Sequence, residues 1–335
     1  MSVLIKIAVS LLPVFVFLSA LIFLDSYKLV KLRSILLTIL FGCLVAGLCA
    51  VINSWLSGML LLEFKFFTRY VAPVIEELLK AVFLVYLIKT EKVGFMVDAA
   101  IYGFAIGAGF AFIENIFYLQ KLAGAHVLVW LVRGFGTAIM HGTTTAIFGM
   151  ISKNLSDNYS SKQVHIFWVG LAAAILLHSF YNHFFLPPIL ITICFVIGLP
   201  LVIVFVFDLS EQATRKWLGV GFDTDVDLLE VITTGDILES RIGKYLESLK
   251  SRFPGAVVAD MLCYLRLHLE LAVRAKGILL MRQSGFEPAS DPEIRTKFEE
   301  LDYLRKSIGK TGKLAILPFL RTSNRDLWQL YLIDK

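Results

Sequence analysis

The feature that most constrains the fold is a series of long apolar runs that fills the first 208 residues. A helix needs roughly 20 predominantly apolar residues to cross the hydrocarbon core of a bilayer. Seven runs are about that long: Leu4–Leu24, Ser34–Trp55, Tyr70–Ile88, Gly94–Leu119, Val127–Ile151, Val164–Phe184 and Pro188–Phe207. We therefore expect an all-α fold, a polytopic membrane helix bundle with about seven transmembrane helices.

Two apolar segments need a separate interpretation. Leu4–Leu24 is longer than the apolar part of a typical signal peptide and lacks a convincing cleavage site, so we expect a retained helix. Leu56–Arg69 is interrupted by Glu63, Lys65 and Arg69, which favours an interfacial segment over an eighth crossing.

Composition divides the chain into two parts. It is 57% hydrophobic and 18% charged, whereas soluble domains are roughly 45–50% apolar and about 25% charged. The apolar excess lies in residues 1–208, so we expect a transmembrane domain there and a soluble, mainly helical domain over 209–335. In the second part, Val226–Leu249 and Ala256–Met281 carry apolar residues at helical spacing, and Glu293–Ile308 does so more weakly. No catalytic motif occurs there, which suits a regulatory or docking domain.

The positions of lysine and arginine predict the orientation, because cytoplasmic loops are enriched in both. With the N-terminus outside, the inner loops hold Lys28, Lys31, Arg33, Lys89, Lys92, Lys153, Lys162, Arg215 and Lys216. The outer connections hold Lys65, Arg69 and Lys121. We therefore expect the C-terminal domain to be cytoplasmic. The lysines and arginines of these loops explain the net charge of +5, so the charge does not indicate a nucleic-acid-binding surface.

Ionisable residues occur inside the apolar runs, where a charge is costly and usually marks a functional site. In the third run, Glu76 and Glu77 precede Lys80 by four and three residues, so the three side chains can interact along the helix. A purely structural explanation is a helix start at the membrane surface, with Pro73 in the first turn and carboxylates favoured by the helix dipole.

The fourth run ends in a polar pair. Gly103 and Gly107 form a small-residue stripe that allows another helix to pack closely. Glu114 follows Phe110 by one turn on the same face. Contact with solvent is a poor explanation for a glutamate at the end of a closely packed, glycine-rich helix. Asn115 can orient this carboxylate or line the same cavity.

The fifth and sixth runs contribute histidines. The fifth run carries Arg133 near its outer end and His141 close to its middle. A lone histidine in a helix is more often a satisfied core residue than a ligand. In the sixth run, His178 and Asn182 are i,i+4 neighbours, whereas His183 points elsewhere and suits the interface.

The predicted topology places most of these residues at a similar depth. The side chains near the outer ends of their helices are Glu76, Glu77, Glu114, Arg133 and His178. His141 lies about two turns deeper, ~12 Å along the helix. Because these helices alternate in direction, independent structural explanations do not predict this coincidence. A shared, water-accessible site in the outer half of the membrane does.

Paired carboxylates with two histidines can activate water, with a tuned glutamate as general base. Two histidines and a carboxylate are also a known zinc ligand set, although HExxH is absent here. The spacing alone fits both a metal-free site and a metal site. Cys43, Cys49, Cys194 and Cys263 form no CxxC pair and three lie in apolar runs, which favours buried thiols over disulfides or a thiolate zinc site.

The chain resembles the PrsW family, bacterial intramembrane proteases related to the CAAX prenyl-protein endopeptidases. The resemblance covers about residues 70–185 and rests on four ordered motifs: Glu76-Glu77-x-x-Lys80, Phe110-x-x-x-Glu114-Asn115, Arg133 with Met140-His141, and His178-x-x-x-Asn182. It implies a glutamate-dependent, often metal-dependent peptidase of the bacterial inner membrane. Such an enzyme cuts membrane-anchored proteins near the outer face, as in site-1 cleavage of an anti-sigma factor.

The same resemblance implies residue roles. Glu76 and Glu77 would be the water-activating pair, and either of the two could be the general base. His141 and His178 would be oxyanion donors or metal ligands, and Glu114 would complete that site at a position where the related enzymes carry a histidine. A divalent metal such as zinc would have Glu114, His141 and His178 as candidate ligands. The supporting residues would be Lys80 and Asn182, which orient the others, with Asn115 and Arg133.

Two other classes of function remain as alternatives. A non-catalytic membrane scaffold or receptor would signal through the cytoplasmic domain, but it needs no water-activating carboxylates. A proton-coupled transporter would also use intramembrane Glu and His. Such proteins often contain inverted repeats, and no self-similarity links the two halves of this chain.

Overall fold

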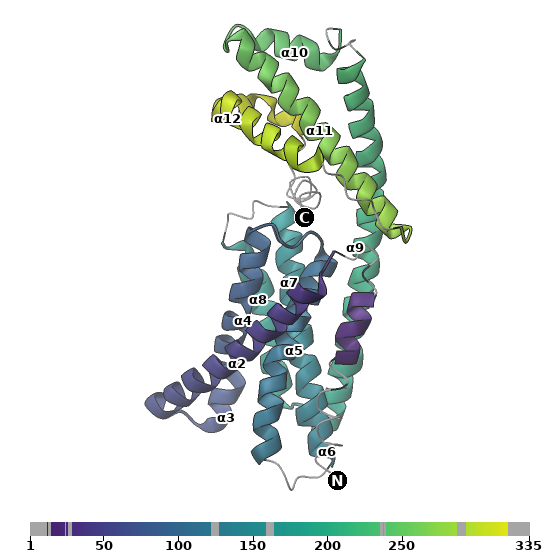
Figure 1. Cartoon of the computed structure of the whole chain (residues 1–335). Coiled ribbons are helices and arrows are strands. Elements are labelled where there is room, and N and C mark those ends of the chain that lie inside the picture. Colours follow the sequence, from purple (N-terminus) through teal and green to yellow (C-terminus); the bar gives the residue numbers. More distant parts are fainter. Residues whose placement is uncertain are drawn as a thin grey trace. The chain divides into compact units, whose positions relative to one another are not determined.

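The computed structural model describes residues 12, 15–23, 25, 29–121, 127–158, 164–234, 237, 239–286 and 293–320. The chain divides into two compact units, Met1–Glu211 and Gln212–Lys335. Regular structure in the described residues is entirely helical (Figure 1), which confirms the all-α fold.

The first unit contains the helices α2 (Leu32–Leu60), α3 (Phe64–Phe66), η1 (Phe67–Val71), α4 (Ala72–Lys89), α5 (Met96–Lys121), α6 (Val127–Trp130), η2 (Leu131–Gly136), α7 (Thr137–Asn158) and α8 (Ile166–His183). The long helix α9 (Pro188–Thr233) begins there and ends in the second unit. The segments η1 and η2 are π-helical turns.

Four of the described helices are long and apolar enough to cross a membrane: Leu32–Leu60, Met96–Tyr118, Ile166–His183 and Pro188–Thr233. Helices α4 and α7 coincide with two further predicted spans. Helix α4 is less apolar because it carries Glu76, Glu77, Lys80 and Lys89. Most of the predicted first span, Leu4–Leu24, lies outside the described residues. The structure thus supports several membrane helices and leaves the number seven as a prediction.

Helix α5 packs against α7 through backbone contacts at glycines. A Cβ atom at Gly103 would lie 2.5 Å from the Thr145 carbonyl oxygen, and one at Gly107 would lie 2.2 Å from the His141 carbonyl oxygen. Helix α2 approaches α5 in the same way, since a Cβ at Gly109 would lie 2.0 Å from the Ile39 carbonyl oxygen. The small-residue stripe therefore holds α7 close enough to α5 for their polar side chains to meet.

The second unit is a helical cluster around α11 (Gly255–Gln283), with α10 (Arg241–Leu249) and α12 (Glu293–Leu320). The predicted helix Val226–Leu249 is interrupted: α9 ends at Thr233, and α10 begins after Ser240, whose hydroxyl caps the Gly243 amide. Helix α12 continues beyond the predicted end at Ile308 through a kink at Gly309, where φ is +65°.

The core of the second unit is apolar, with Met261, Leu265, Leu271 and Leu279 fully buried on α11. The same helix buries Lys276, whose ammonium lies 2.6 Å from the Asp225 carboxylate of α9. Burial lowers the pKa of nearby His268 to about 4, so that this imidazole is neutral at pH 7.

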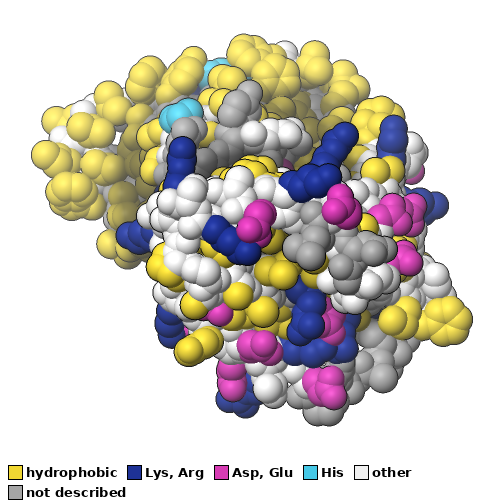
Figure 2. Space-filling model, turned by 90° about the horizontal axis from the view of Figure 1, so that it is seen from above, with side chains coloured by type: hydrophobic (Ala, Val, Ile, Leu, Met, Phe, Trp, Pro, Cys, Tyr) yellow, Lys and Arg dark blue, Asp and Glu magenta, His cyan; other side chains and the backbone are white. Residues whose placement is uncertain are grey.

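The surface reflects the difference in composition along the chain. In the face shown in Figure 2, charged side chains of both signs are interspersed over one region, while another region is almost uniformly hydrophobic. Leu44, Val51, Trp55 and Met59 of α2 are among the exposed large hydrophobic residues. Such an exposed apolar helix face is expected where a helix contacts lipid.

We predict that Gly107→Ala lowers the free energy of unfolding by about 1–3 kcal/mol, because its methyl group would push the α7 backbone away. Gly47→Ala on α2 is the matched control, since no atom lies within 4 Å of a Cβ there. It should be neutral or stabilise by up to about 1 kcal/mol. Thermal unfolding of the purified full chain in detergent measures both, and equal melting temperatures would contradict close packing at Gly107.

Candidate active site

Helix α4 supplies a buried ion pair at the centre of the first unit. The Lys80 ammonium lies 2.7 Å from Glu77 Oε1, and the two side chains are 0% and 1% exposed. The ammonium also lies 4.3 Å from the centre of the Phe110 ring on α5. A charge in such apolar surroundings is tolerable only when it is paired and hydrogen-bonded.

His178 of α8 joins this pair. Its Nδ1 lies 2.8 Å from Glu77 Oε1, the oxygen that also accepts from Lys80. Because a carboxylate accepts hydrogen bonds, Nδ1 of the neutral ring carries the proton and Nε2 keeps its lone pair. That Nε2 lies 3.8 Å from Glu76 Oε2. Glu77 thus orients His178 toward Glu76.

His141 of α7 connects the ion pair to α5. Its Nδ1 lies 2.9 Å from Lys80 Nζ, and its Nε2 lies 2.8 Å from Glu114 Oε2. Since an ammonium donates, Nδ1 accepts and the neutral ring donates from Nε2 to Glu114. The His141 ring stands nearly perpendicular to that of His178, with centroids 4.8 Å apart.

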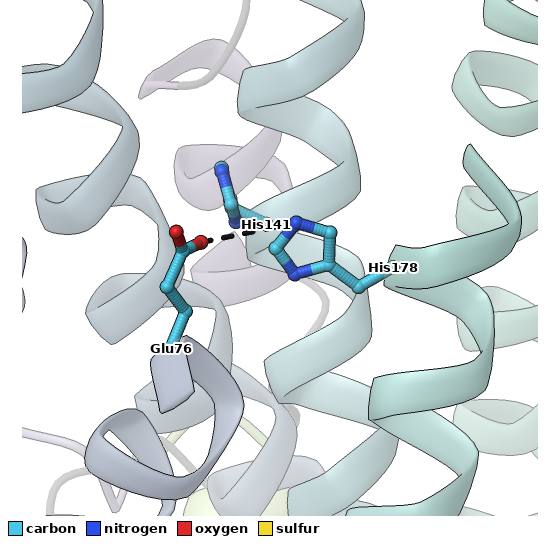
Figure 3. A group of neighbouring side chains, drawn as sticks. All are labelled: Glu76, His141 and His178. Atoms are coloured by element: carbon cyan, nitrogen blue, oxygen red, sulfur yellow. Dashed lines mark ion pairs between the residues drawn. The ribbon is translucent and has the colours of Figure 1, made fainter. Parts of the chain in front are cut away.

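Three of these side chains form a group suited to a metal ion. Donor atoms of Glu76, His141 and His178 all lie within 4.8 Å of one another, and Figure 3 shows the carboxylate facing the two rings. Two imidazoles and a carboxylate match a catalytic zinc ligand set, with Glu76 as the carboxylate in place of Glu114, which the sequence suggested as a candidate ligand. The Glu77 contact with His178 is the carboxylate–histidine pairing that usually supports a metal-bound imidazole. His141 can bind an ion only by giving up one of its two hydrogen bonds.

Exposure identifies the accessible side of the site. The side chains of Glu114 and Glu76 are 24% and 15% exposed, whereas those of Glu77, Lys80, His141 and His178 are between 0% and 3% exposed. The structure therefore brings together all five residues that the sequence proposed as catalytic. Glu76 and Glu114 form its accessible edge, and Glu77 lies behind them.

Two of the predicted supporting residues, Asn115 and Asn182, bind the backbone of other segments. The Asn115 amide donates to the Gly134 carbonyl oxygen in η2 at 3.1 Å, and the Asn182 amide donates to the Thr68 carbonyl oxygen in η1 at 3.1 Å. Both therefore bind the backbone of π-helical turns, one before α7 and one before α4. Arg133 lies in η2, but its side chain is outside the described residues.

Two further residues of α8 hold the same turns. Tyr181 donates to the Val132 carbonyl oxygen at 2.9 Å, and Ser179 donates to the Arg69 carbonyl oxygen at 2.6 Å. A π-helical turn leaves the regular hydrogen-bond ladder and is frequent at functional sites. Sequence reasoning missed both residues, because a tyrosine and a serine inside an apolar run carry no distinct signal.

Sequence reasoning also missed Asn53 of α2. Its Nδ2 donates to Glu76 Oε1 at 3.1 Å. By contrast, His183 lies away from the cluster: its Nδ1 is 2.7 Å from the Ser179 carbonyl oxygen and its ring stacks on Phe185, in line with the expectation from sequence.

Carboxylates and imidazoles that converge inside an apolar helix bundle mark a functional site in a membrane protein, and they can form a hydrolytic centre. A comparison with protein families agrees: the model of the PrsW family of intramembrane metalloproteases matches residues 31–208, more than half of the chain. The chain belongs to this family, which confirms the resemblance seen in its motifs, and it is a membrane-embedded peptidase. No curated protein and no solved structure matches it.

We predict that Lys80→Met destabilises the protein by about 3–5 kcal/mol, because it leaves the Glu77 carboxylate buried without its cation. The double variant Glu77→Gln/Lys80→Met should recover much of this loss, since it removes both charges. Lys65→Met, at an exposed lysine of α3, is the control. Denaturant unfolding in detergent measures all three, and a double variant no more stable than Lys80→Met would contradict the pairing.

Proposed function

We propose that the chain hydrolyses a peptide bond in membrane-anchored protein substrates near the outer face of the membrane. The observation that carries this proposal is the convergence of Glu76, Glu77, Glu114, His141 and His178 into one buried, hydrogen-bonded cluster. Family membership gives the class of reaction, and the cluster gives the residues that would perform it.

A divalent ion such as zinc suits the charge of this cluster. Even with Glu114 set aside, two carboxylates, Glu76 and Glu77, face one ammonium, that of Lys80. A buried excess of negative charge is costly, and a bound cation or a proton taken up by one carboxylate would offset it. Glu76, His141 and His178 would hold the ion, which would supply Lewis-acid activation of water and of the scissile carbonyl.

The contacts separate the roles of the three carboxylates. Glu77 is occupied by Lys80 and His178, so it orients His178 and does not reach the substrate. Glu76 supplies the oxygen that faces His178. Glu114 is the most exposed of the three, which supports a role for it as the general base that takes a proton from water. This assignment moves the base from the Glu76–Glu77 pair to Glu114.

The position of the site supports cleavage near the outer face. The loop charges predict a topology with seven spans, the N-terminus outside and residues 209–335 in the cytoplasm. In that topology Glu76 and Glu114 lie near the outer ends of their helices. A bacterial inner membrane and an anti-sigma factor as substrate follow from the family resemblance, and the C-terminal domain would then regulate or dock partners.

We predict that Glu76→Gln and His178→Ala each reduce cleavage by about 100-fold or more, because each removes one of the three side chains that would hold the ion. The assay is co-expression with a panel of tagged single-pass membrane proteins, followed by detection of a shortened product. Glu63→Gln and His183→Ala are matched controls, since one lies before α3 and the other stacks outside the cluster.

A product that is formed by the wild type and both controls but lost in both site variants would support the proposal. A product that persists in both site variants would place the catalytic centre elsewhere. If the wild type forms no product but retains a bound partner, the scaffold alternative would gain support.

A further inference from the structure

Helix α2 carries one amide that its apolar character does not explain. Apart from Arg33 near its start, α2 has no acidic or basic side chain and no histidine. Asn53 is its single amide. Its neighbours Val51 and Trp55 are largely exposed, as lipid-facing residues would be. Burial of an amide is costly unless it is hydrogen-bonded.

The amide is directed toward the active site. Asn53 Nδ2 donates to Glu76 Oε1 at 3.1 Å, and Asn53 Oδ1 is buried without a hydrogen-bond partner among the described residues. The bond to Glu76 is therefore the polar contact that offsets burial of this amide. One turn earlier, Cys49 is buried on the same face of α2 and packs against Phe110 of α5.

The contact determines how the Glu76 carboxylate is presented. Asn53 binds Oε1, while Oε2 is the oxygen that lies 3.8 Å from His178 Nε2. No other side chain described in the structure donates a hydrogen bond to Glu76. Without Asn53 the carboxylate would be free to rotate about its last bond, and either oxygen would face the histidines.

The part of α2 around Gly42 and Cys43 packs against α5 through contacts that do not involve the bond between Asn53 and Glu76. A Cβ at Gly42 would lie 2.1 Å from the Ile106 carbonyl oxygen, and Cys43 donates to the Gly109 carbonyl oxygen at 3.3 Å. In residues 50–60, the Asn53 amide makes the one side-chain hydrogen bond that joins this part of α2 to another described helix. The loss of Asn53 should therefore change Glu76 without loosening α2 from α5.

We infer that Asn53 is a positioning residue that holds Glu76 in its metal-binding orientation. The inference rests on the proposed function, in which Glu76, His141 and His178 hold a divalent ion. Hydrogen-bond partners of metal ligands typically contribute about 10–100-fold to metal affinity. Here the partner comes from a helix that carries no other member of the cluster.

The test measures zinc affinity of the purified full chain in detergent, by competition with a chromogenic chelator. Asn53→Leu keeps the size of the side chain and removes the amide, so it should fold as well as the wild type. We expect it to bind zinc about 10–100-fold more weakly. Asn53→Gln, which keeps an amide donor, should recover part of the affinity. Ser54→Leu is the control, because the adjacent serine is exposed.

A double variant shows whether Asn53 acts through Glu76. In a Glu76→Gln background, Asn53→Leu should change zinc affinity by less than about twofold, because contacting residues couple in such cycles. A full loss in that background would overturn the inference. So would an Asn53→Leu variant that binds zinc as tightly as the wild type, and this result would leave the proposed metal centre intact. A wild type that binds no zinc would contradict the metal centre and the inference with it.

Discussion

The buried ion pair between Glu77 and Lys80 is the interaction on which the rest of the site depends. Glu77 Oε1 accepts from both Lys80 and His178, and Lys80 in turn contacts His141. Three helices, α4, α7 and α8, therefore meet at one pair of charges. Because an unpaired charge in apolar surroundings is strongly unfavourable, the pair fixes these helices relative to one another as well as supporting the chemistry.

Close packing of α5 completes this arrangement. The absence of a side chain at Gly107 lets the α7 backbone approach α5 at His141, and Glu114 then reaches His141 Nε2. The π-helical turns before α4 and α7 are held by side chains of α8 and α5. The candidate catalytic residues thus lie on helices whose entry segments are themselves hydrogen-bonded, which limits their movement.

The sequence predicted the helical class and the five central residues, because ionisable side chains in apolar runs are conspicuous. It did not predict which side chains pair, since those contacts join helices far apart in the chain. Asn53 was missed because its role depends on the hydrogen bond to Glu76 of α4, and the sequence alone does not show which helices pack together. The π-helical turns were missed for a different reason: they change hydrogen bonding without changing the pattern of apolar residues. In the second unit, the break between α9 and α10 was missed although Thr233, Thr234, Gly235 and Asp236 interrupt the apolar spacing there.

We propose that side chains of α4, α7 and α8 form one metal centre beside Glu114. X-ray absorption at the zinc K-edge, measured on the purified protein with one equivalent of zinc, tests it most directly. We expect nitrogen and oxygen ligands with imidazole scattering, no sulfur, and weaker imidazole scattering in His178→Ala. Sulfur ligands, or a spectrum that His141→Ala and His178→Ala leave unchanged, would contradict it.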